Sequence, residues 1–215
     1  MLGWPLMPVA ITDAIQTIAE AERRFELSKI EEPSFFPEWQ MGLPILSESE
    51  KSSLDELRGR YLYQRSEGQL LEGTVTLLLA SPLLATAGFY DPPFLVKAEE
   101  SIQIRLDDGE EILNGRMDVL VLKNRLWVVV LESKKTALSV WAALPQTLAY
   151  LTANPDRQQP SFGMVTNGDD IFFIKLTQQP QKCYSLSRVF APFASKQELH
   201  SALQVLKGIG QAAKT

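Results

Sequence analysis

The chain has 215 residues, enough for one ordinary domain with a sizeable core; 45% of them are hydrophobic and 22% charged, the usual balance of a globular protein. The formal net charge of −5 excludes binding to nucleic acid by bulk positive charge, so any such contact must be local, metal-assisted or shared with a partner. No export signal is found, and the longest apolar stretch, residues 75–89, is interrupted by Ser81, Pro82 and Thr86. We therefore expect a cytoplasmic protein that does not enter a membrane.

The first third of the chain predicts helices separated by loops. After an irregular start, Thr12 or Asp13 is predicted to cap a helix that runs to Phe25, and a loop rich in proline and aromatic residues follows it. A polar helix then carries Leu54, Leu57 and Tyr61 on one face, and residues 72–79 predict a buried helix, apolar nearly all round. We assign residues 1–44 to an N-terminal helical extension and residues 45–215 to the main domain.

The rest of the chain changes to the alternation that is typical of strands. Residues 95–106, 111–122 and 126–131 predict three strands joined by turns at 108–109 and 123–125, the third of them central in the sheet. A helix over 139–153, interrupted by Pro145, precedes two more strands at 161–166 and 170–176, and a capping box of Ser195 and Glu198 opens the last helix. This order predicts an α/β sandwich: a central mixed β-sheet with an antiparallel three-strand meander, flanked by helices.

The chemically informative residues lie on the second and third of these strands. Asp118 and Glu132 lie symmetrically about Arg125, so a hairpin folded there places the two carboxylates opposite one another, and Lys134 shares a strand face with Glu132. A fold keeps two opposed carboxylates when a cation sits between them or when they share a proton. Oxygen ligands with positions open to water suit Mg²⁺ or Mn²⁺ better than zinc, and Lys134 adds a charge that can hold water or phosphate. These are the requirements of phosphodiester hydrolysis.

The pattern Asp118, Glu132-Ser-Lys134, and Gln146 four residues before Tyr150 resembles the PD-(D/E)XK nuclease superfamily with its QxxxY element. The likeness extends to RecB-type nucleases, to the nuclease domain of type I restriction motor subunits and to stand-alone cyanobacterial endonuclease-like proteins. It implies a restriction-endonuclease-like fold, with Asp118 and Glu132 binding metal and Lys134 positioning the nucleophile. Met117 departs from the family, which has proline there.

The same resemblance assigns roles to three further residues. Gln146 and Tyr150 would contact DNA or support the metal site, and Glu72 would be the accessory acidic metal ligand, with Glu67 as its alternative. By this resemblance the protein would cut DNA with Mg²⁺, as a homodimer or beside a helicase or specificity subunit.

The sequence is also compatible with two other functions. The protein could be a non-catalytic nucleic-acid-binding or assembly subunit that keeps the fold, which the negative charge favours. It could also be a structural protein in which the three charges simply pair. Trp141 is interpreted as a core aromatic, Arg58 and Arg65 as a solvated helix face, and Cys183 and His200 as bystanders.

Overall fold

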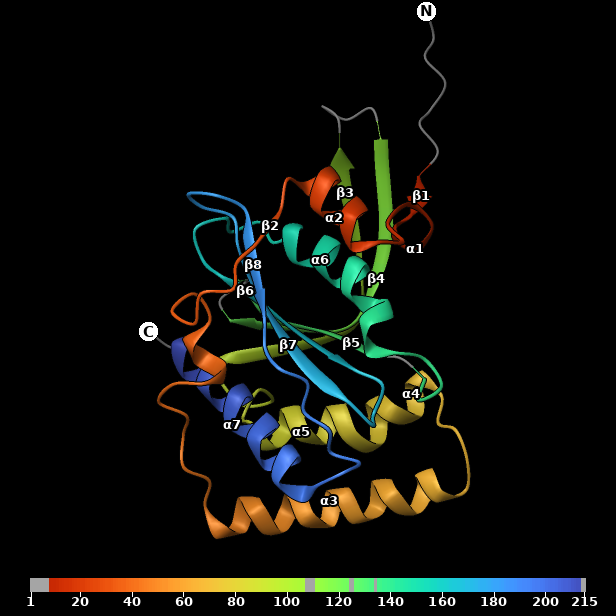
Figure 1. Ribbon diagram of the computed structural model, residues 1–215, viewed down its shortest axis with the longest axis vertical. Coiled ribbons are helices and arrows are strands. Elements are labelled where there is room, and N and C mark those ends of the chain that lie inside the picture. Colours follow the sequence, from red (N-terminus) through yellow and green to blue (C-terminus); the bar gives the residue numbers. More distant parts are fainter. Residues whose placement is uncertain (1–7, 107–110, 124–125, 134, 214–215) are drawn as a thin grey trace, which may run out of the picture.

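The computed structural model describes residues 8–106, 111–123, 126–133 and 135–213, of which 126–133 are described by their backbone alone. These residues form one mixed sheet between two layers of helices (Figure 1). The strand order is β1-β4-β5-β6-β7-β8-β2, and β3 pairs with β4 as well. The predicted α/β sandwich around a mixed sheet is confirmed.

The sheet consists of three long strands, three shorter ones and two very short segments. In chain order they are β1 Val9–Ala10, β2 Ser28–Lys29, β3 Phe94–Leu106, β4 Glu111–Lys123, β5 Leu126–Ser133, β6 Ser161–Thr166, β7 Ile171–Thr177 and β8 Cys183–Leu186. The predicted meander is confirmed, since β3 and β5 both lie antiparallel to β4. The predicted central place of β5 is confirmed too, because it pairs with β4 on one side and β6 on the other.

Helices cover both faces of the sheet (Figure 1). They are α1 Ile11–Ala14, α2 Ile18–Phe25, η1 Pro37–Trp39, α3 Glu48–Ser66, α4 Glu72–Val75, the π-helical turn η2 Thr76–Ala80, α5 Ser81–Thr86, η4 Val140–Ala143, α6 Leu144–Thr152 and α7 Lys196–Ala212. Buried side chains of α3, α5 and α7 form one core with the sheet, and those of α1, α2 and α6 form another. Within the described residues, no helix is both long and apolar enough to cross a membrane.

Several local predictions were wrong at the ends of helices. The first predicted helix is split in two, and Thr17 rather than Thr12 or Asp13 makes the capping box, with Glu20. Pro145 does not interrupt α6, because it occupies the first turn, where a proline N–H is not needed. Glu198 forms no capping box with Ser195, because its carboxylate binds Arg188.

Two further differences concern burial and short strands. Leu77 is 70% exposed, so the helical run from Glu72 is not buried all round. β1, β2 and β8 were not predicted, since two to four residues carry too little alternation to be recognised. The predicted turn at 108–109 lies outside the described residues, as do residues 124–125 of the predicted turn at 123–125, while Lys123 ends β4. The division at residue 44 stays a prediction.

Candidate functional site

The register of β4 and β5 brings the two candidate metal ligands to neighbouring positions. Val119 pairs with Leu131, so Asp118 and Glu132 are each the next residue beyond this pair, on adjacent strands about 5 Å apart. The register shifts by one residue between Val121 and Leu122, so that Leu122 pairs with Trp127 and Val121 with Val129. One residue beyond the last pair of this ladder, the register leads to residues 118 and 132, and the opposition of their side chains stays a prediction. The Glu132 side chain and all of Lys134 lie outside the described residues.

Asp118 lies where the β3–β4 hairpin bends. The ladder pairs Ala98 with Val119 and Glu100 with Met117, while Glu99 between them has a φ of 54°, in the left-handed region. Met117 and Val119 would share a face in a regular strand, yet they belong to the cores on opposite sides of the sheet. The faces of β4 are therefore exchanged between Met117 and Val119. Asp118, which lies between them, is half-buried. Bends of this kind re-aim a side chain, and they are common beside active sites.

Gln146 and Tyr150 reach the same part of β4 from helix α6. The Tyr150 hydroxyl accepts a hydrogen bond from Gln146 Nε2 at 2.5 Å and donates one to the Arg116 carbonyl oxygen at 3.1 Å, two residues before Asp118. Both side chains are buried. Gly115 makes this approach possible, because a Cβ there would lie 2.6 Å from Tyr150 Cε1. The pair thus fixes the β4 backbone beside Asp118.

Glu72 is exposed at the first position of α4, and its neighbours tie it to the end of β5. The Thr136 N–H donates to the Leu70 carbonyl oxygen at 3.1 Å, and the Leu70 N–H donates to Thr136 Oγ1 at 3.0 Å. The chain after Lys134 and the chain before Glu72 are therefore held side by side. Among the side chains that the structure describes, no group of three or more potential metal ligands is found.

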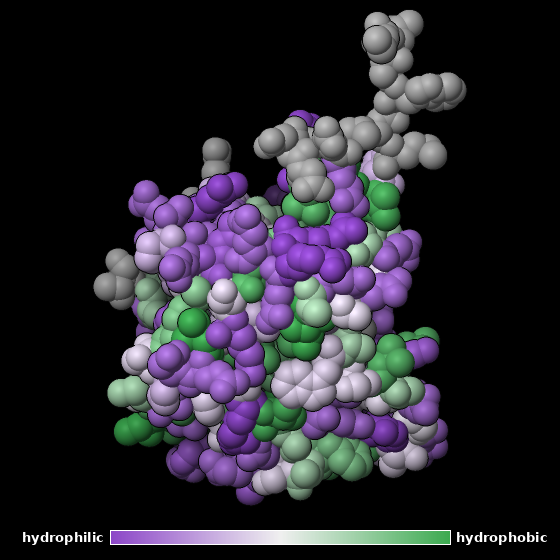
Figure 2. Space-filling view, turned by 45° about the horizontal axis from the view of Figure 1, so that its top comes forward, coloured by the Kyte–Doolittle hydropathy of each residue, from purple (hydrophilic) through white to green (hydrophobic). Residues whose placement is uncertain are grey.

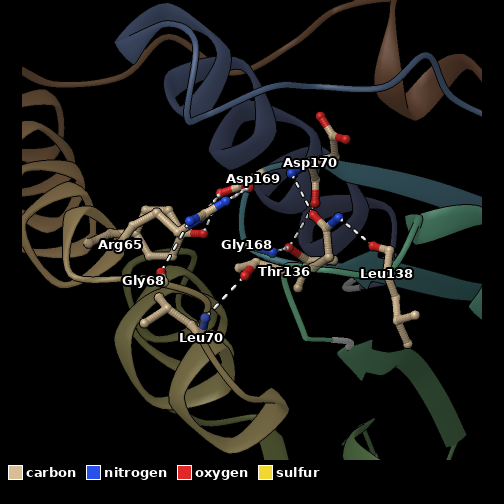
Figure 3. Close-up of polar contacts among 11 residues, drawn as sticks. Arg65, Gly68, Leu70, Thr136, Leu138, Gly168, Asp169 and Asp170 are labelled. Atoms are coloured by element: carbon tan, nitrogen blue, oxygen red, sulfur yellow. Dashed lines mark hydrogen bonds and ion pairs between the residues drawn. The ribbon is translucent and has the colours of Figure 1, made fainter.

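A network of side chains surrounds this tie (Figure 3). Asn167, in the β6–β7 turn, donates from Nδ2 to the Leu138 carbonyl oxygen at 2.8 Å. Asp169 in the same turn accepts hydrogen bonds from Arg65, with an ion-pair distance of 3.1 Å, and from the Tyr61 hydroxyl at 2.8 Å. Burial, and then the hydrogen bond to Asp169, raise the pKa of Tyr61, which keeps that hydroxyl protonated and donating. None of these contacts was predicted, since they join segments that lie far apart in the sequence.

Three interpretations of flanking residues need correction. Trp141 is 43% exposed rather than a core aromatic, and one face of its ring stacks on buried Phe172 with centroids 4.6 Å apart. Arg58 is not a simple solvated residue, because it donates to the carbonyl oxygens of Pro192 and Phe193. Arg65 is held by Asp169, as described above.

Comparison with known proteins adds a family to this geometry. The family model for the N terminus of the type I restriction enzyme R protein matches residues 45–182, which is more than half of the chain. The chain belongs to this family. The sandwich described above agrees with a restriction-enzyme-related, nuclease-like domain.

The chain is also similar to a solved fragment assigned as the HsdR subunit of a type I restriction enzyme from Vibrio vulnificus YJ016. The match has 19% sequence identity and a TM-score of 0.41, and covers 63% of this chain. It spans only 25% of the Vibrio chain. No curated protein matches the sequence.

Proposed function

We propose that the protein is a metal-dependent deoxyribonuclease of the PD-(D/E)XK type. The observation that carries the proposal is the β4–β5 register, which sets Asp118 and Glu132 at neighbouring positions of adjacent strands. Membership of the restriction-enzyme family supports the same class of chemistry.

The donor set fits Mg²⁺ or Mn²⁺. Carboxylate oxygens of Asp118 and Glu132, with Glu72 as the accessory acid, are the ligand type that both ions prefer. A bound ion would supply Lewis-acid stabilisation of the charge on the phosphate oxygens. Lys134 would hold the attacking water or a phosphate oxygen by its ammonium group, and so orient the nucleophile for attack on phosphorus.

Gln146 and Tyr150 act in this proposal by supporting the site rather than by touching DNA. Their burial and their bond to the Arg116 carbonyl oxygen favour that choice between the two roles that the resemblance leaves open. They hold the backbone that presents Asp118.

Trp141 is the described side chain best suited to contact DNA in this proposal. Glu132 pairs with Val165, and Val165 pairs with Phe172, on which Trp141 stacks. Two strand spacings, about 10 Å, therefore separate the backbone of Glu132 from that of Phe172. The free face of an exposed tryptophan can stack on an unpaired base. Trp141→Ala should weaken binding of single-stranded DNA several-fold, and Trp141→Phe should retain most of it.

The test is cleavage of supercoiled plasmid DNA with Mn²⁺. Lys134→Ala keeps the proposed metal ligands, so cleavage should fall by orders of magnitude while the Mn²⁺-induced rise in melting temperature remains. Lys135→Ala is the matched control, since it removes the neighbouring exposed lysine and should cut like the parent. Asp118→Asn should lose both cleavage and the metal response. Equal cleavage by the parent and Lys134→Ala would contradict the proposal.

The second candidate function is a non-catalytic assembly subunit that keeps this fold. The net charge of −5 favours it, because such a surface binds a basic partner more readily than DNA. In Figure 2 hydrophilic residues gather over the upper part of the visible face and hydrophobic residues are scattered. If the parent neither binds nor cuts DNA but forms a stable complex with a helicase or specificity subunit, this function replaces the first.

A further inference from the structure

Three segments of the chain close a ring of hydrogen bonds beside the candidate site (Figure 3). We call it the clamp ring, and it consists of residues 65–70, 136–138 and 167–170. The first segment binds the second through Leu70 and Thr136. The second binds the third through the Leu138 carbonyl oxygen and Asn167.

The third segment returns to the first and completes the clamp ring. Asp169 accepts hydrogen bonds from Arg65, and Arg65 also donates to the Gly68 carbonyl oxygen at 3.1 Å. The turn that presents these groups is itself fixed: Asn167 Oδ1 accepts from the Asp170 N–H, and Thr166 Oγ1 accepts from the Gly168 N–H. Gly168 has a φ of +92°, and a Cβ there would lie 2.3 Å from the Tyr61 hydroxyl oxygen. Each segment is thus bound to the other two.

We propose that Thr136 is a positioning residue that holds Glu72 at a fixed separation from the end of β5. The inference rests on the nuclease function proposed above. Leu70 lies two residues before Glu72, and Thr136 lies three residues after Ser133, the last residue of β5. The paired bonds between Leu70 and Thr136 therefore link the segment that precedes the accessory acid to the segment that follows the strand carrying Glu132.

Metal binding depends on such a separation, because coordination geometry tolerates shifts of only about 0.5 Å. The Thr136 hydroxyl accepts one of the two bonds, and the backbone of Thr136 makes the other. Removing the hydroxyl should leave β5 in the sheet, which its neighbours on both sides hold, and should loosen the start of α4. The effect should therefore appear in metal affinity more than in the fold.

The test measures Mn²⁺ affinity and cleavage for Thr136→Val, Thr136→Ser and the parent. Thr136→Val keeps the shape and loses the acceptor, so the Mn²⁺ concentration for half-maximal cleavage should rise by roughly 10–100-fold. Thr136→Ser restores the hydroxyl and should match the parent. Thr86→Val is the matched control, because Thr86 makes its hydroxyl bond within α5, to the Pro82 carbonyl oxygen. Melting without metal, measured beside the assay, reports any cost to the fold.

A double-mutant cycle with Glu72→Gln separates positioning from a general structural role. If Thr136 acts through Glu72, Thr136→Val should change Mn²⁺ affinity less than about twofold when Glu72 has already been replaced. An unchanged effect of Thr136→Val in that background would overturn the inference. If Thr136→Val fails to fold, Arg65→Lys opens the clamp ring at its ion pair with Asp169, and the same loss of affinity is expected there.

Failure of this inference and failure of the proposed function give different results. A parent that binds Mn²⁺ and cuts DNA, with Thr136→Val equal to it, overturns the role of Thr136 and leaves the nuclease intact. A parent with no Mn²⁺ response at all overturns both.

Discussion

The two sides of the candidate site are held in place by different kinds of contact. On one side, which we call the hairpin side, Gly115 lies against the Tyr150 ring and against Ile11, and the pair Gln146–Tyr150 adds a short polar link. On the other side, the clamp ring consists of polar contacts between chain segments.

The two sides should therefore tolerate different substitutions. A close-packed contact without spare volume is sensitive to added atoms and indifferent to pH. A network of hydrogen bonds is sensitive to the loss of one donor or acceptor and to the charge of its carboxylates. Substitutions of matched size on the two sides should therefore separate them.

The largest effect is expected from Gly115→Ala on the hairpin side. The new Cβ would lie 2.6 Å from Tyr150 Cε1 and 2.8 Å from Ile11 Cδ1, so the ring must move. We expect a loss of about 3 kcal/mol of unfolding free energy, at the upper end for overpacking, and reduced cleavage. Gly59→Ala in α3 is the control, since nothing lies within 4 Å, and it should gain about 0.5–1 kcal/mol. Urea denaturation measures both, and a stabilised Gly115→Ala would refute the packing argument.

Asn167→Ala should have the next largest effect, on the clamp ring. It removes a buried amide and leaves the Leu138 carbonyl oxygen and the Asp170 N–H without that partner. The expected loss is about 2 kcal/mol, because buried polar groups lose their compensation. Gln158→Ala, at an exposed loop position, should change stability by less than about 0.5 kcal/mol. If thermal melting shows no difference between the two variants, the clamp ring contributes nothing to stability.

Tyr150→Phe should cost less, about 1 kcal/mol, since it keeps the ring and removes only the hydroxyl. The Arg116 carbonyl oxygen then loses its donor, and Gln146 loses its acceptor at Tyr150. Cleavage should fall more than stability, because the β4 backbone beside Asp118 is released. A cleavage rate equal to that of the parent would show that the hydroxyl does not support the site.

The smallest effect is expected from Asp170→Asn, and it depends on pH. Burial, and then the neighbouring Asp169, raise the pKa of Asp170 in the folded protein. The folded state therefore binds a proton more tightly than the unfolded state, and the parent loses stability as pH rises through the raised pKa. Asp170→Asn lacks this loss, so it should be slightly more stable than the parent at neutral pH, by less than about 1 kcal/mol. Below the ordinary carboxyl range the two should melt alike, and a difference that persists there would contradict the assignment.

Much of the sheet could be predicted because its strands are long enough to show their alternation. β3, β4 and β5 were predicted within two residues at every end. The symmetry of Asp118 and Glu132 about the turn agrees with the β4–β5 register, in which the two residues lie next to the pair Val119–Leu131. Helix α6 lies within the helix predicted over 139–153, which puts Gln146 and Tyr150 on one face. The roles of these residues stay a prediction.

Contacts between segments that are distant in the chain could not be predicted from the sequence. Thr136, Asn167 and Asp169 are ordinary turn residues in a linear pattern. Only the fold brings them to their respective partners Leu70, Leu138 and Arg65. The exposure of Trp141 was missed for a related reason, since an aromatic at helical spacing is usually buried. In the stacked pair of rings, Phe172 is the buried residue and Trp141 the partly exposed one.

The N-terminal strands have a consequence for the order in which the protein folds. β1 lies beside β4, β2 lies beside β8, and α2 between them packs on α6, so residues 9–29 form a strap across one helical layer (Figure 1). The contact of Ser28 with Cys183 closes a loop of more than 150 residues, which is entropically costly before the rest of the sheet exists. Because of this cost, we expect the strap to dock after the rest of the sheet has formed. Until then, the outer surface of α6 faces water.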